Sequence, residues 1–242
     1  MLHAIISNKS GRIKIGDESI SIREIYKERE DMITAAIISR IGYLSDSVLQ
    51  RMLKSIFPLS DIDFTELTQI EFWPNFKSSY QTRVEPDVIL HFSWGIILIE
   101  AKRPHDGFQY AEQWRNELEA LPEGYKKDQI YFLALGGRKV NFDVEKARVI
   151  ELISNDKGIT AIQMPTFIEH IDWLELAKEL NTIQQTMTLS RNDKCVICDM
   201  LAVLELYNVT TTCYPLKTLI SSNLSIDNTV FDVMNRWKRP QA

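Results

Sequence analysis

The segment at residues 85–104, EPDVILHFSWGIILIEAKRP, restricts the possible fold more than any other part of the chain. Its two apolar runs, VIL and IILI, are rich in β-branched residues, and the dipeptide SW between them is short enough for a tight hairpin turn. If Phe92 faces Gly95 across that turn, counting outward places Asp87 opposite Glu100. The sequence therefore predicts two adjacent strands that carry opposed carboxylates at their outer ends.

Hydrophobic periodicity predicts helices and further strands on both sides of this hairpin. Residues 1–20 are expected to form a short strand, a Ser-Gly turn and a second short strand. The elements expected after them are helices over 22–56 with a break at 42–45, strands at 64–72, 84–92 and 95–101, a helix at 107–121, a strand at 130–135, a helix at 144–153, a strand at 159–164, and helices at 166–183 and 191–207. The central order is α-β-β-β-α-β, followed by another helix and strand.

The length and composition favour one sizeable domain with an appended part. The chain has 242 residues, and its 45% hydrophobic content can fill a core. We expect residues 1–165 to form the α/β domain and residues 166–242 to form a mainly helical extension that serves interaction or oligomerisation. No apolar run approaches the ~18 residues of a membrane span, and the N-terminus lacks the order of a signal peptide. These features predict a cytoplasmic protein with no membrane partner.

The formal net charge of −5 argues against bulk attraction to nucleic acid, because that mode needs many Lys and Arg side chains to neutralise phosphates. A local basic cleft remains compatible with this charge. The three cysteines are odd in number and C-terminal, so we expect reduced thiols. Cys195 and Cys198 form a C-x-x-C without a second ligand pair nearby, so we expect them to pack inward on one helical turn rather than to bind zinc.

Two opposed carboxylates are a poor way to stabilise a sheet, because like charges repel and apolar neighbours strengthen the repulsion. A divalent cation such as Mg²⁺ resolves this conflict at Asp87 and Glu100. Since strand side chains alternate between faces, Lys102 lies on the same side as Glu100 and could reach a metal-bound water or a phosphate. The alternative is a solvated ladder in which the two acids pair with Arg83 and Lys102, or in which Glu85 neutralises the lysine.

Together, Pro86-Asp87, a hairpin of twelve residues and Glu100-Ala101-Lys102 resemble the motif of the PD-(D/E)XK nuclease superfamily, also called restriction endonuclease-like. The resemblance covers roughly residues 22–164 and implies the same core fold, an α-β-β-β-α-β mixed sheet flanked by helices. It also implies metal-dependent hydrolysis of phosphodiester bonds.

The resemblance further implies roles for single residues. The catalytic set would be Asp87, Glu100, Lys102 and Gln113, with Lys102 stabilising charge rather than acting as a base. Magnesium, or manganese as a substitute, would be held by Asp87, Glu100 and a helix acid, for which Glu30 is preferred over Glu28 and Asp31. The side chains expected to bind nucleic acid are Gln109, Arg103 and Arg115.

The expected substrate is DNA, in a restriction, repair or phage-defence role. Because the chain is acidic, a homodimer or a protein partner would help it to hold a duplex. The alternative is an inactive or partner-activated module of the same fold that serves interaction or regulation in a larger complex.

Overall fold

The fold is known from a computed structural model, which describes residues 2–16, 18–78, 81–104, 107–125, 129–156 and 162–211. Its centre is a five-stranded mixed sheet with the strand order β3-β4-β5-β6-β7. The strands are β3 (Leu67–Phe72), β4 (Val88–Phe92), β5 (Gly95–Ala101), β6 (Gln129–Leu135) and β7 (Phe167–Ile171). The first three strands are antiparallel neighbours, whereas β5, β6 and β7 run parallel to one another.

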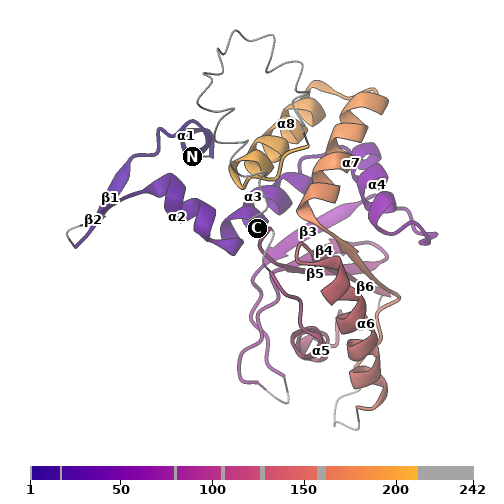
Figure 1. Ribbon diagram of the computed structural model, residues 1–242. Helices are drawn as coiled ribbons and strands as arrows, with labels where there is room; N and C mark the ends of the chain where they lie inside the picture. Colours follow the sequence, from indigo (N-terminus) through magenta and orange to yellow (C-terminus); the bar gives the residue numbers. More distant parts are fainter. Residues whose placement is uncertain are drawn as a thin grey trace, which may run out of the picture. The chain divides into compact units, whose positions relative to one another are not determined.

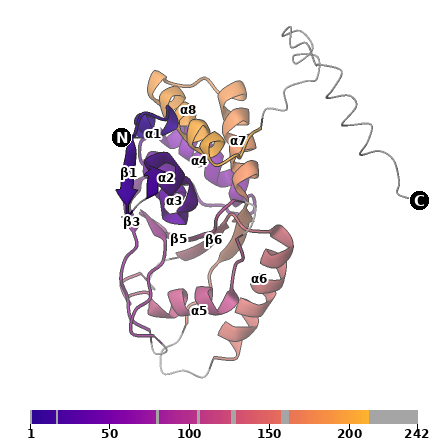
Figure 2. The same ribbon diagram turned by 60° about the vertical axis from the view of Figure 1, so that its left-hand side comes forward.

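Helices cover both faces of this sheet, and the two ribbon views agree on the layers (Figure 1, Figure 2). One face carries α5 (Ala111–Ala120) and α6 (Lys139–Ser154). The other face carries α3 (Glu30–Ile41), α4 (Asp46–Ile56), α7 (Trp173–Thr186) and α8 (Arg191–Leu206). The N-terminal part consists of α1 (Leu2–Ile6), a separate hairpin of β1 (Arg12–Ile15) and β2 (Glu18–Ser21), and α2 (Ile22–Glu28). The chain is therefore an α/β protein with a three-layer arrangement.

The β4–β5 hairpin has the predicted register, since Phe92 pairs with Gly95 and Val88 pairs with Ile99. Gly95 has φ +155°, and a Cβ atom at this position would lie 2.1 Å from the carbonyl oxygen of Gln129. Only glycine allows β6 to start this close to the turn. The hairpin is thereby fixed against its parallel neighbour.

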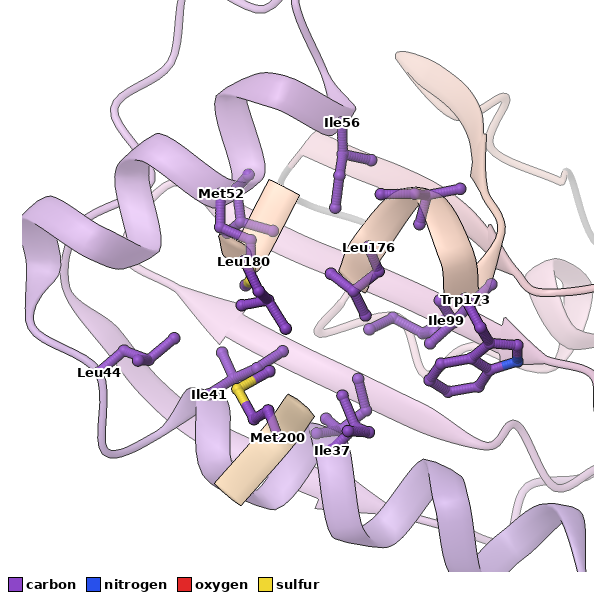
Figure 3. Close-up of a cluster of buried hydrophobic side chains, with 14 of the residues drawn as sticks. Ile37, Ile41, Leu44, Met52, Ile56, Ile99, Trp173, Leu176, Leu180 and Met200 are labelled. Carbon is purple, nitrogen blue, oxygen red and sulfur yellow. The ribbon is translucent and has the colours of Figure 1, made fainter. Parts of the chain in front are cut away.

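Side chains of β4, β5 and β6 alternate between two apolar clusters, as expected for strands that are buried on both faces. The larger cluster fills the space between the sheet and the four helices α3, α4, α7 and α8 (Figure 3). In it, Ile37 and Ile41 of α3 meet Met200 of α8, and Ile99 projects from the sheet towards Trp173 (Figure 3). Both C-terminal helices therefore belong to the main core.

The helices predicted for residues 22–56 are confirmed as α2, α3 and α4, with a break between Ile41 and Asp46. The first predicted strand is wrong, because the chain begins with a helix, α1, before the β1–β2 hairpin. The last predicted strand, at 159–164, lies partly outside the described residues, and the strand that joins the sheet is β7, which was predicted as the start of a helix. Asp172 explains this error, since its side chain and that of Glu175 form a capping box that starts α7 only after β7 has ended.

The boundary predicted at residue 165 does not divide the structure, because one compact unit extends from Met1 to Thr210. Asp193 at the start of α8 illustrates the physical link. Its carboxylate accepts hydrogen bonds from the backbone N–H of Ser45 at 2.8 Å and from the hydroxyl of Ser190 at 2.6 Å. The helices expected as a separate extension thus cap and cover the α/β core.

Cys195 and Cys198 are free thiols, as expected, but both are exposed rather than packed inward. Their helix, α8, buries a different stripe that includes Ile197 and Met200. Among the described residues, no helix is long and apolar enough to span a bilayer.

Candidate active site

Asp87 lies directly before β4 at one edge of the hairpin, and its position is fixed from two sides. Its Oδ2 atom accepts a hydrogen bond from the backbone N–H of Ala101 at 2.8 Å, across from the end of β5. Its carbonyl oxygen accepts a hydrogen bond from the N–H of Trp73 at 3.0 Å. The carboxylate therefore lies beside the last residues of β5, as the hairpin register predicted.

Glu100 points from β5 towards α5 and is almost fully buried, with 1% of its surface exposed. Its Oε1 atom accepts a hydrogen bond from Nε2 of Gln113 at 2.6 Å and contacts Nζ of Lys102. Its Oε2 atom is buried and has no hydrogen-bond partner among the described residues. A buried carboxylate oxygen without a partner is costly, so this atom is the natural place for a cation or a proton.

Lys102 follows β5 and lies between two acids. Besides its contact with Glu100, its Nζ atom lies 3.8 Å from Oε1 of Glu30. Burial alone would lower the pKa of Lys102, but the carboxylates of Glu100, Glu30 and Asp87 outweigh burial and raise it. Lys102 therefore remains a cation at neutral pH, which favours charge stabilisation over proton abstraction.

Glu30, the first residue of α3, reaches the same sheet edge. Its Oε2 atom accepts a hydrogen bond from the backbone N–H of Arg103 at 2.7 Å. Burial is the main cause that raises its pKa, while the charge of Lys102 opposes the rise. Of the three helix acids considered from sequence, Glu30 is thus the one that contacts the Glu100-Lys102 segment.

Burial raises the pKa of Asp87 to about 8, and the charge of Glu100 adds to the increase. The solvated salt-bridge ladder does not describe this arrangement, because Arg83 pairs instead with Glu85 at 2.8 Å and Glu100 is buried. The two acids form a crowded negative site with one nearby ammonium group.

A further acid, Glu117 of α5, was missed in the sequence analysis. It is 2% exposed, its Oε2 atom has no hydrogen-bond partner among the described residues, and its pKa is raised well above the usual value. Burial is the largest cause, followed by the charge of Glu100, to which a protonated Glu117 can donate a hydrogen bond. The signal was its spacing of four residues from Gln113, which places both side chains on one helix face.

The residues expected to bind nucleic acid lie in different surroundings. Gln109 precedes α5 instead of lying on it, is fully buried, and accepts a hydrogen bond from Nε1 of Trp114 at 3.0 Å. Its amide also lies 3.4 Å from the carbonyl oxygen of Glu100, so it supports β5 and cannot contact a substrate. Arg115 is half-buried beside Asn116, two residues and about 200° around the helix from Gln113. Arg103 is exposed at the site.

The expected three-carboxylate metal site is not assembled as predicted. Among the residues that the structure describes, no three His, Cys, Asp or Glu side chains gather into a group that could hold a metal ion. Glu30 lies against Lys102 and Arg103 instead of completing such a group. Asp87 and Glu100 nevertheless fit a hard cation that keeps several waters, because the two carboxylates are close enough for the charge of Glu100 to raise the pKa of Asp87, and Oε2 of Glu100 is buried without a partner among the described residues.

Comparison with known proteins finds a relative whose function is not described. An uncharacterized protein of Pasteurella multocida (strain Pm70) is 32% identical over 161 residues, which are 66% of this chain and 60% of that protein. The match thus spans less than two thirds of the relative's length. No family model and no solved structure matches the chain.

Proposed function

We propose that the chain is a metal-dependent nuclease of the restriction endonuclease-like type that hydrolyses phosphodiester bonds in DNA. The observation that carries the proposal is the meeting of Asp87, Glu100 and Lys102 at one end of the β4–β5 hairpin, with a buried oxygen of Glu100 left without a partner. A purely structural ion pair would not require two like-charged carboxylates at the same sheet edge.

Asp87 and Glu100 are the residues that would hold the metal, for which magnesium is the first choice and manganese a substitute. When bound, the metal would polarise the phosphate and lower the pKa of a bound water. Lys102, kept protonated by its acidic neighbours, offsets the negative charge that develops on the phosphate. Gln113 holds Glu100 by its 2.6 Å hydrogen bond and so orients the carboxylate that the metal needs.

Incubation of the purified protein with supercoiled plasmid and with single-stranded DNA tests this proposal. The reactions contain Mg²⁺, Mn²⁺ or EDTA, and they compare the wild type with Lys102→Ala. A matched control is Lys146→Ala, because Lys146 is also a partly buried lysine paired with an acid, Glu169, but lies on α6 and is more exposed than Lys102. We expect cleavage that needs metal, is lost in Lys102→Ala and persists in Lys146→Ala.

A folded wild-type protein that cuts neither substrate with either metal would contradict the proposal. An inactive or partner-activated module would then explain the retained fold, and the next measurement would be the mass of the complexes that the chain forms in solution.

A further inference from the structure

A cavity of about 340 Å³ lies beside the candidate active site. Its lining comes from the segments that follow β5, β6 and β7, from the starts of α6 and α7, and from Val209 after α8. Trp173 joins the two places directly, because its indole Nε1–H donates a hydrogen bond to the carbonyl oxygen of Lys102 at 2.7 Å. The cavity therefore lies next to the segment that carries the candidate catalytic lysine.

The chemistry of the cavity is divided between an apolar part and a cationic rim. Trp173 and Val209 are buried, while Leu174 is 37% exposed at the surface. Arg138 and Lys139 are both exposed, and the Arg138 guanidinium lies over the ring of Phe108 at 5.4 Å from its centroid. The Phe108 ring holds the guanidinium at the side of the cavity, and an aromatic ring does not cancel its positive charge.

The acid in the lining, Asp172, offsets one of these two positive charges, so the charged groups of the lining keep a net positive charge. The Asp172 carboxylate accepts a hydrogen bond from the N–H of Glu175 at 2.7 Å and is used to start α7. An occupant must therefore be anionic at one end and apolar or planar at the other. A cavity of this volume suits a group the size of one nucleotide.

We infer that this cavity binds one nucleotide of the DNA strand that is cut, adjacent to the phosphate at Lys102. Arg138 and Lys139 contact the phosphate of that nucleotide, and Leu174 with the apolar wall contacts its sugar or base. The inference rests on the proposed function in taking DNA as the substrate, and it concerns binding only.

Binding of a fluorescently labelled single-stranded oligonucleotide, followed by anisotropy over a salt series in EDTA, tests the inference without any cleavage. Each phosphate contact with a single strand contributes about 0.7 to the slope of log K against log salt concentration. Since Arg138 and Lys139 contact the same phosphate, we expect Arg138→Ala and Lys139→Ala each to reduce the slope by part of this amount, and both substitutions together to reduce it by about the whole. We expect Leu174→Ala to weaken binding at every salt concentration with an unchanged slope.

The matched control is Lys178→Ala, which removes an exposed lysine of α7 that does not line this cavity. An equal change in the control would mean that general surface charge binds the strand, and it would overturn the inference. Unchanged binding in the three cavity variants, or no binding by the wild type at low salt, would overturn it as well. The binding assay contains no metal, so its outcome does not depend on whether the protein cleaves DNA. If the cavity variants weaken binding but the wild type cuts nothing, the nucleotide-binding inference stands and the nuclease proposal fails.

Discussion

Replacing Asp87 with asparagine is expected to stabilise the metal-free protein at alkaline pH. In the unfolded chain this carboxyl has the ordinary aspartate pKa of 3.8, whereas in the native state its pKa is about 8. Between these values the native state binds more protons than the unfolded state, so stability falls as pH rises. Asparagine removes this loss, and its amide oxygen can still accept the hydrogen bond from Ala101.

The magnitude follows from the pKa difference of roughly four units, since each unit corresponds to about 1.36 kcal/mol and the upper limit is thus about 5 kcal/mol. Local relaxation and water entry reduce the cost of burying a charge, so we expect a gain of about 2–3 kcal/mol near pH 8. Urea unfolding in EDTA measures it, in the wild type and in Asp87→Asn, near pH 5 and near pH 8. The gain should be smaller at the lower pH.

The same unfolding measurement with Mg²⁺ in place of EDTA tests whether Asp87 holds a metal. At a concentration about 100 times its dissociation constant, a ligand of the native state adds about 2.7 kcal/mol. Mg²⁺ should therefore stabilise the wild type and leave Asp87→Asn nearly unchanged. If the variant is less stable than the wild type near pH 8 without metal, or if both lose stability equally between the two pH values, the electrostatic reasoning is refuted.

Three further substitutions test the packing around the site and the fold. Glu117→Gln should stabilise the metal-free protein by about 1–3 kcal/mol at neutral pH, because the amide can donate the same hydrogen bond to Glu100 without the cost of keeping a buried carboxyl protonated. Thermal unfolding in EDTA detects this gain, and a loss of stability would contradict it. Asp193→Asn should cost about 1–3 kcal/mol at neutral pH in urea unfolding. Burial alone would raise the pKa of Asp193, but the hydrogen bonds from Ser190 and Ser45 have the larger combined effect and lower it. The cost of Asp193→Asn should therefore disappear as pH falls below the usual carboxyl range, because the native carboxylate then becomes protonated. A cost that persists in acid would argue against this reasoning. Gly95→Ala should cost about 3 kcal/mol or more, since its Cβ would meet Gln129, and wild-type stability in the same assay would show that the close approach is not real.

The part of the site that lies on the hairpin could be predicted from the sequence, because local rules determine it. A two-residue turn sets the register, and strand alternation then places Glu100 and Lys102 on one side. Glu117 could not be placed in this way, since its burial depends on the rotation of α5 against the sheet. Gln109 was misassigned for a different reason, because helix α5 begins only at Ala111 and not at residue 107.

The errors beyond residue 155 have a different origin. The sequence of β7, FIEHI, continues without a glycine or proline into α7, so its periodicity merges with that of the helix. The capping pair Asp172 and Glu175 was the local signal that separates the two elements. The link between Ser45 and Asp193 spans most of the chain and has no local signature.

The hydrogen bond from Trp173 to the carbonyl oxygen of Lys102 joins two segments that leave the ribosome at different times. The segment with Asp87, Glu100 and Lys102 is synthesised early, but the indole that supports it emerges some seventy residues later. Helix α3, which carries Glu30, likewise obtains its apolar cover from α8, which is synthesised much later. A nascent chain therefore cannot complete this site until α7 and α8 have also left the ribosome.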